Sequence, residues 1–216
     1  VLTLDGFAAD ASLEVSSTGD EFTLELTGDQ WEAGSDAGFE LVSQTRLQTM
    51  AAGTITSLSI GSALTPVGDV ENGAGAVHVD SLEIISNGSV ILNNIHNDFG
   101  SISIDTDDSL ISITDANGLS LDHLHTSGSL LIQADSVNDV ATGDIHIGGH
   151  AALTADSIIL GDEVSDAVNF GSVTFSSSGD VDVAEDSDTV LAGANSAANL
   201  TLNSSGTLTD ASASLT

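Results

Sequence analysis

The sequence predicts an all-β protein, specifically a parallel β-helix (β-solenoid), in which one short strand is restarted many times. A glycine and a small polar residue repeatedly precede apolar residues that alternate with polar ones. Glycine tolerates a positive φ and is therefore expected to form a turn, and the alternation after it is typical of a half-buried strand. Aromatic residues make up only 3% of the chain, so the core must consist of Val, Ile, Leu and Ala. The clearest copies of the phrase are residues 88–92, 100–104, 128–132, 143–147, 171–175, 179–183 and 206–209.

The first part of the chain, residues 1–52, differs from the rest in composition. It holds the only Trp, Trp31, and the only basic residue, Arg46. Short alternating segments there are typical of strands. We expect this region to be an N-terminal β cap that covers one end of the solenoid core, or else a small separate β domain.

Residues 53–216 are the predicted solenoid repeat region. Residues 61–76 contain the only proline and four glycines, so we expect an irregular loop there. From Val77 onward the strand phrases follow one another closely, with no helical periodicity. Coils of roughly 20 residues with two or three short strands each would turn the chain into a rod.

An antiparallel β-sandwich or jelly roll is the alternative. The pairs Asn72-Gly73, Asn87-Gly88 and Asn117-Gly118 are typical of two-residue hairpin turns. The uneven spacing of the glycine phrases also suits a sandwich. Against it, the strand segments are short, and residues 90–92 and 158–160 are apolar without alternation.

Charge excludes several classes of partner. The chain has 33 acidic residues against one basic residue, a formal net charge of −32. Nucleic acid is not expected as a partner, because binding its phosphates needs Lys and Arg. No run of 18 apolar residues occurs, so we expect no membrane span. Cys is absent, which excludes disulfides, and the absence of Lys excludes isopeptide cross-links.

The last third of the chain carries phrases such as "VNFGSVTFSSSGDVDVAEDSDTVLAGANSAANLTLNSSGTLTDA". This stretch resembles the repeat region of large bacterial surface proteins related to filamentous haemagglutinin, and residues 77–148 resemble it more loosely. The resemblance implies a right-handed β-helix and a secreted adhesin or surface-fibre segment. It implies no catalytic residue.

Two acidic clusters are candidate calcium sites. They place carboxylates in short turns after strands, where oxygens from adjacent turns could supply the six to eight ligands that Ca²⁺ takes. The competing interpretation is a solvated turn. No cofactor is required by this prediction, and Ca²⁺ is the ion it allows. The candidate ligands are Asp105, Asp107, Asp108, Asp186 and Asp188.

Histidines form a second candidate group. His123 and His125 are two residues apart, so they share one face of a strand. With His146 and His150 they would form a three-histidine site only if the coils align these positions. The alternative is that they are surface or turn histidines.

We therefore expect a non-enzymatic structural or adhesive segment of a secreted, extracellular or cell-surface protein. The chain starts without Met and ends in a strand-like segment, so we expect a processed product or a piece of a longer polypeptide. Self-association into a fibre or a longer array is the expected partnership, with a cell-surface receptor as a further one. The alternatives are a cation-dependent binding module for a surface glycan or protein, and a glycan-degrading β-helix enzyme using Asp pairs such as Asp180 and Asp182.

Overall fold

The structure is a computed structural model of the 216-residue chain. It describes residues 13–15, 25–26, 44–49 and 55–61, and then most of the chain from 63 to 216. The gaps in that last part are 64–65, 67, 73–75 and 108. Side chains are described from Leu58 onward.

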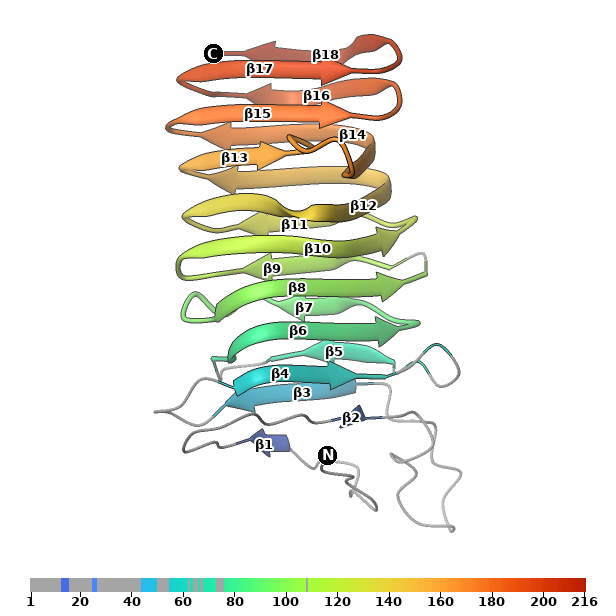
Figure 1. The fold of residues 1–216 in the computed structure, drawn as a ribbon, viewed down its shortest axis with the longest axis vertical. Coiled ribbons are helices and arrows are strands. Elements are labelled where there is room, and N and C mark those ends of the chain that lie inside the picture. The colour runs from blue at the N-terminus through green and yellow to red at the C-terminus, as the bar shows by residue number, and fades with distance from the viewer. Residues whose placement is uncertain are drawn as a thin grey trace.

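Every regular element in the described residues is a β-strand, and the strands stack into a β-solenoid of about eight turns (Figure 1). The all-β prediction is therefore confirmed. The strands are β1 (Leu13–Val15), β2 (Glu25–Leu26), β3 (Gln44–Thr49), β4 (Ile55–Ile60), β5 (Asp69–Glu71), β6 (His78–Ser86), β7 (Val90–Leu92), β8 (Asp98–Thr106), β9 (Ile111–Thr114), β10 (Gly118–Thr126), β11 (Leu130–Gln133), β12 (Ser136–Ala155), β13 (Ser157–Leu160), β14 (Ala167–Ser177), β15 (Asp180–Glu185), β16 (Thr189–Asn195), β17 (Asn199–Ser204) and β18 (Leu208–Leu215).

Strands pair in parallel with the strand one coil further along, so β6 pairs with β8 and β8 with β10. On the other layer, β7 pairs with β9 and β9 with β11. From β5 onward, the pairs of residues that lie nearest each other along the sequence include Leu121 and Asp139. The pairs that lie farthest apart along the sequence include Ile158 and Val181. These spacings agree with the coil length expected from the sequence. The antiparallel sandwich is wrong for the described strands.

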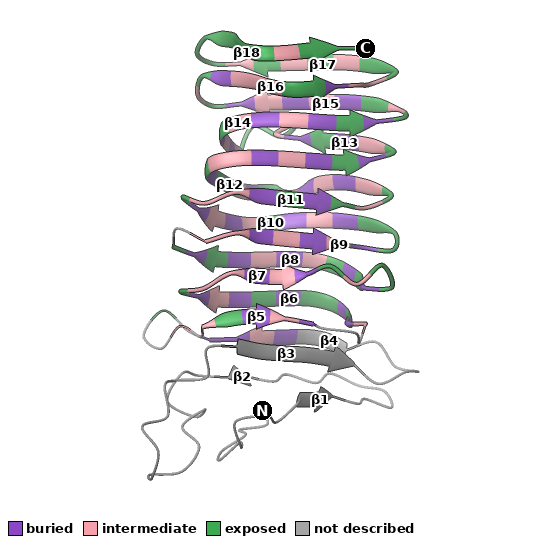
Figure 2. Ribbon diagram, turned by 180° about the vertical axis from the view of Figure 1, so that it is seen from behind, coloured by how far each residue is buried: buried purple, intermediate pink, exposed green. Residues whose placement is uncertain are grey.

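The coil is right-handed. In Figure 1 the near strands, such as β6, β8 and β10, run to the right as the chain rises from the N-terminal end. The far strands, β7, β9 and β11, run back to the left, and Figure 2 shows them from behind. A right-handed crossover between parallel strands is the usual one, because of the right-handed twist of the strands.

Apolar ladders between the two layers form the core. On the near layer, the ladder Ile84, Ile104, Leu124, Ile145 and Val168 climbs one residue per coil. All five side chains are 0% exposed. Burial of each such side chain contributes about 1.5–3 kcal/mol, so the repeated ladder is the main source of stability. On the far layer the equivalent ladder is Val90, Ile111, Leu130, Ala151 and Val173.

The glycines of the repeated phrase are needed for a reason that differs from the expected one. Among the described glycines only Gly61, Gly161 and Gly193 have positive φ, and none of them starts a clear copy of the phrase. Most of the phrase glycines instead lie against the preceding coil, and Gly143, which lies against Asp139 of its own strand, is the exception. A Cβ at Gly128 would overlap the Ser109 backbone, and one at Gly171 would overlap the carbonyl of Gly148. Close approach between coils, and not an unusual φ, selects glycine there.

Buried hydroxyls hold the corners where the chain passes from one layer to the other. Ser86 Oγ accepts a hydrogen bond from the Gly88 N–H (2.9 Å) and donates to the Gly68 carbonyl of the preceding coil (2.8 Å). Thr126 Oγ1 accepts from the Gly128 N–H in the same way (2.9 Å). The pair Asn87-Gly88, which suggested a hairpin, is therefore part of a coil corner.

The N-terminal region and the expected loop are described only in part. Three strands of residues 1–52 are described, and each pairs in parallel: β1 with β3, β2 with β4, and β3 with β5. The rest of residues 1–52 lies outside the described residues. The segment 61–76 contains β5, which pairs with β3 and β7.

Candidate metal-binding clusters

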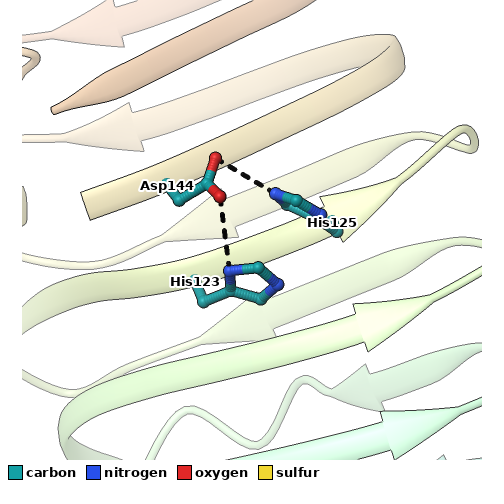
Figure 3. A group of neighbouring side chains, drawn as sticks. All are labelled: His123, His125 and Asp144. Atoms are coloured by element: carbon teal, nitrogen blue, oxygen red, sulfur yellow. Dashed lines mark ion pairs between the residues drawn. The ribbon is translucent and has the colours of Figure 1, made fainter. Parts of the chain in front are cut away.

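A cluster of histidine and aspartate side chains lies on the outer surface of the near layer. Along β10 the inward Leu121 and Leu124 are buried, whereas His123 and His125 are partly exposed on the outside. Parallel pairing with β12 places Asp144 beside His123 and His146 beside His125. Figure 3 shows the Asp144 carboxylate facing the imidazoles of both His123 and His125.

The distances in this cluster are short. His125 Nε2 lies 3.1 Å from Asp144 Oδ1, and His123 Nδ1 lies 3.7 Å from Asp144 Oδ2. The centroids of the His123 and His125 rings are 3.9 Å apart. One donor atom from each of the three residues lies within 4.8 Å of the other two. The three side chains are 35%, 36% and 48% exposed, so the cluster is open to solutes.

The structure brings together three of the four histidines singled out in the sequence. His146 packs edge-on to His125, with ring centroids 5.8 Å apart. His150 instead contacts Ser172 Oγ through Nδ1 at 2.9 Å. Sequence reasoning missed Asp144. Asp144 directly follows the glycine of the phrase at 143–147. Its pairing with His123 depends on a shift in the register between β10 and β12.

A second cluster is formed only by carboxylates. Asp139 of β12 points into the core, where it pairs with the buried Leu121 of the coil below. Asp162 and Asp166 belong to the loop between β13 and β14, and one oxygen from each of the three residues lies within 4.8 Å of the others. Asp139 is 9% exposed. Its Oδ2 accepts the Gly161 N–H at 2.8 Å, but its Oδ1 is buried without a hydrogen-bond partner.

Burial and like charge both act on Asp139. The pKa of this carboxyl is raised to about 6, mainly by burial and also by the charges of Asp166 and Asp162, while the hydrogen bond from the Gly161 N–H acts to lower it. The two loop aspartates are thus close to a carboxylate that has no nearby cation in the described residues. Such a site favours either a proton or a bound cation.

The loop between β13 and β14 is tied to β12 at several points. Asp166 Oδ1 accepts the Gly143 N–H at 3.2 Å, and Asp166 Oδ2 accepts the N–H of Glu163 at 2.8 Å. Ser165 Oγ donates to the Ala141 carbonyl. These contacts hold Asp166 over Asp139, and oxygen-only donor sets of this kind suit Ca²⁺.

The aspartates predicted as calcium ligands lie at or near coil corners. Asp105 lies near the end of β8 with Asp107 just after it, and Asp186 and Asp188 lie at the corner after β15. Asp188 Oδ1 accepts the Thr207 N–H at 2.7 Å, and Asp186 Oδ2 accepts the Val168 N–H at 3.2 Å. These last two carboxylates therefore bind backbone of neighbouring coils. Asp108 lies outside the described residues, and calcium binding at the five positions stays a prediction.

Two more buried carboxylates, Glu185 and Asp115, lie at coil corners. Glu185 is 3% exposed, and its Oε1 accepts the Phe170 N–H at 2.8 Å. Burial raises the pKa of Glu185 above its ordinary value, although the hydrogen bond from Phe170 acts in the opposite direction. Burial also raises the pKa of Asp115, which caps the N–H groups of Phe99 (2.7 Å) and Asn117 (2.8 Å).

Within the part of the chain that the structure describes, no helix has the length and apolar character needed to cross a membrane. No family model, no curated protein and no solved structure matches the chain.

Proposed function

We propose that this chain is a non-enzymatic structural or adhesive segment of a secreted, cell-surface or extracellular fibre protein. The observation that carries this proposal is the uninterrupted parallel stack from β5 to β18. In such a stack each coil contacts only its neighbours and shares with them a backbone ladder and a core ladder. Bending the solenoid would break both, so the coils act as a stiff rod.

Charge supports the same function. With a net charge of −32 and a single basic residue, neighbouring rods repel one another along their sides. This favours extended and separate rods over lateral bundles. Trypsin has one site in the whole chain, so a rod of this composition also resists one common class of protease. The resemblance of residues 149–216 to filamentous-haemagglutinin-like repeats points to a surface location.

The coil formed by β17 and β18 presents exposed apolar side chains and an open strand edge. Leu208 and Leu215 are 52% and 58% exposed there. In the coil below, their paired residues, Thr189 and Asn195, are each only 1% exposed. Figure 2 shows that this coil is mainly exposed, in contrast to the coils below it. A further parallel coil, for example from a second copy, would cover the exposed leucines and pair the open ladder.

The test is to locate the protein and measure its shape. We expect immunogold labelling with an antibody against this chain to decorate extended structures outside the source cells. Sedimentation of the purified chain should show an elongated particle that lengthens as concentration rises. Labelling confined to the cell interior would contradict the surface proposal, and turnover of a polysaccharide would contradict the non-enzymatic one.

A cation-dependent binding module is a second candidate, favoured by the unpaired Asp139 Oδ1 beside Asp162 and Asp166. A Ca²⁺ ion there would balance the buried charge and fix the loop between β13 and β14, which then could present a surface to a glycan or protein receptor.

Thermal melts in EDTA and in Ca²⁺ test this second candidate. Ca²⁺ should raise the Tm of the wild type and of the control variant Asp122→Asn, whose side chain is exposed. Asp139→Asn should show a clearly smaller rise. Equal rises in all three proteins would mean that Ca²⁺ acts only on the general charge, and would exclude the site.

A further inference from the structure

We propose that His123, His125 and Asp144 form a binding site for a divalent transition-metal ion of the Zn²⁺ type, on the outer surface of the rod. Two imidazoles and one carboxylate form a donor set found in protein zinc sites. The site is separate from the rod function proposed above, because its side chains point away from the core that holds the coils together.

The backbone fixes the three donors before any ion binds. His123 and His125 are held two residues apart on β10, and pairing of β10 with β12 sets Asp144 opposite His123. Inward neighbours on both strands, Leu124 and Ile145, are 0% exposed and lock this register. A metal ion would therefore meet a preorganised site instead of having to order three mobile side chains.

The spacing of the donors suits a small ion. Ligands bound to zinc at about 2.0–2.2 Å in tetrahedral geometry lie about 3.3–3.5 Å from one another. The distances from Asp144 oxygens to His125 Nε2 (3.1 Å) and His123 Nδ1 (3.7 Å) bracket that value. All three donor atoms lie within 4.8 Å of one another, so rotations of these partly exposed side chains would bring them to a shared ion (Figure 3).

The contacts within the cluster leave a donor atom unsatisfied. His125 Nε2 is buried and lies 3.1 Å from Asp144 Oδ1, yet the two are not aligned for a hydrogen bond. The rings of His123 and His125 lie 3.9 Å apart, so both imidazoles face the same small volume beside Asp144. One cation bound there would give Nε2 the partner that it lacks.

The donor types select the ion. Imidazole nitrogen suits Zn²⁺, Cu²⁺ and Ni²⁺, whereas Ca²⁺ and Mg²⁺ prefer sites made of oxygens only. His146, edge-on to His125, is the nearest further imidazole, and the partial exposure of the cluster leaves room for water as a remaining ligand. The strongly negative net charge of the chain raises the local concentration of any cation.

The experiment is a calorimetric titration of the EDTA-treated and dialysed chain with Zn²⁺ in excess Mg²⁺, so that Mg²⁺ occupies the all-oxygen clusters. Four proteins are compared: the wild type, His125→Ala, Asp144→Asn, and the control His96→Ala, which removes an exposed histidine of the turn before β8. We expect the wild type and the control to bind one ion with equal affinity. Each ligand variant should lose at least about tenfold in affinity.

Co²⁺ gives a second readout, because tetrahedral Co²⁺ bound to nitrogen and oxygen absorbs visible light strongly. The absorbance should appear with the wild type and with His96→Ala, and not with His125→Ala or Asp144→Asn. Melts in EDTA would show that all four proteins fold, as expected for changes at side chains about one-third or more exposed. Absence of Zn²⁺ binding by the wild type in excess Mg²⁺, or equal binding by all four proteins, would overturn the site.

Discussion

The coils from β6 to β9 and the coils from β12 to β14 follow the same path but differ in regularity. In the lower coils the spacing between paired residues hardly changes from one coil to the next. One inward position there is filled by Leu82, Ile102 and Leu121 in turn. In the upper coils Asp139 occupies that inward position. A loop at 161–166 separates β13 from β14, with no counterpart in the lower coils.

Buried polar groups show the same difference. Asn97, 0% exposed in the lower coils, donates through Nδ2 to the carbonyls of Leu92 and Thr114 and accepts the Val77 N–H. Asp139 in the upper coils keeps one oxygen unpaired. The buried polar group of the regular coils thus finds its hydrogen-bond partners within the repeat. The irregular coils instead leave a buried polar atom without a partner, where a ligand could bind. Departures from the repeat, more than the repeat itself, indicate where a ligand could bind.

The largest expected effect comes from moving the irregular feature into a regular coil. Ile102→Asp would remove a buried apolar side chain from the ladder. It would place a carboxylate there without a loop whose N–H groups could donate hydrogen bonds to it. We expect the free energy of unfolding to fall by about 4 kcal/mol or more. The matched control is Ser103→Asp, one residue along the same strand and facing outward, which should change stability by about 0.5 kcal/mol or less. Urea denaturation followed by circular dichroism measures both, and similar losses would show that the inward face is not the stabilising one.

Much of the regular region was predictable from the sequence. Alternation after each glycine identifies the strands, and most of the core is made of small branched side chains as expected. The expectation of a core of Val, Ile, Leu and Ala alone was wrong, because Phe99, Phe170 and Phe175 are also buried there. The coil length of roughly 20 residues was expected from β-helices in general, because the glycine phrases are unevenly spaced. The role of the glycines was assigned to positive φ, and this was wrong, because contact with the preceding coil is not visible in a single short phrase.

The candidate sites depend on register, which local patterns do not contain. Asp139 follows Asn138, and such a pair is typical of a turn. Only the pairing of Asp139 with Leu121 shows that its side chain points inward. The pairing of His123 with Asp144 requires the segment 140–143 of β12 to lie opposite the single Asp122 of β10. Sequence spacing alone therefore suggested a histidine site but could not supply its carboxylate.

The second effect tests the contact between coils. Gly171→Ala would push a Cβ into the carbonyl of Gly148 in the coil below, and that backbone cannot move without disturbing the ladder. We expect a loss of about 1–3 kcal/mol in the free energy of unfolding. Gly118→Ala is the control, because the atom its Cβ would meet is Ser136 Oγ, which can rotate away. Equal losses for the two variants in urea melts would argue that backbone freedom, and not close approach, selects these glycines.

A third and smaller effect concerns the irregular coil itself. Asp139→Asn removes the buried charge, while the amide oxygen can still accept the Gly161 N–H. In EDTA at pH 7.5 we expect the variant to be more stable than the wild type by about 1–2 kcal/mol, because a neutral side chain is no longer near two carboxylates. The exposed change Asp122→Asn should leave stability nearly unchanged. A destabilised Asp139→Asn protein would show that the charge is already balanced in the absence of added cation.

The smallest effect is a pH dependence at Glu185, at a corner of the upper stack. Because burial raises the pKa of this carboxyl in the folded chain, its contribution to stability is fully present below the pKa of the unfolded chain, near 4.5. That contribution is lost as the pH rises through the higher folded value. Glu185→Gln keeps an oxygen for the Phe170 N–H but does not titrate, so its unfolding free energy should fall less than that of the wild type between pH 4 and pH 8. Chemical denaturation at several pH values measures the two slopes, with Glu83→Gln as the exposed control. Parallel slopes for wild type and Glu185→Gln would mean that Glu185 is already ionised at no cost, and the upper corners would then be as well satisfied as the lower coils.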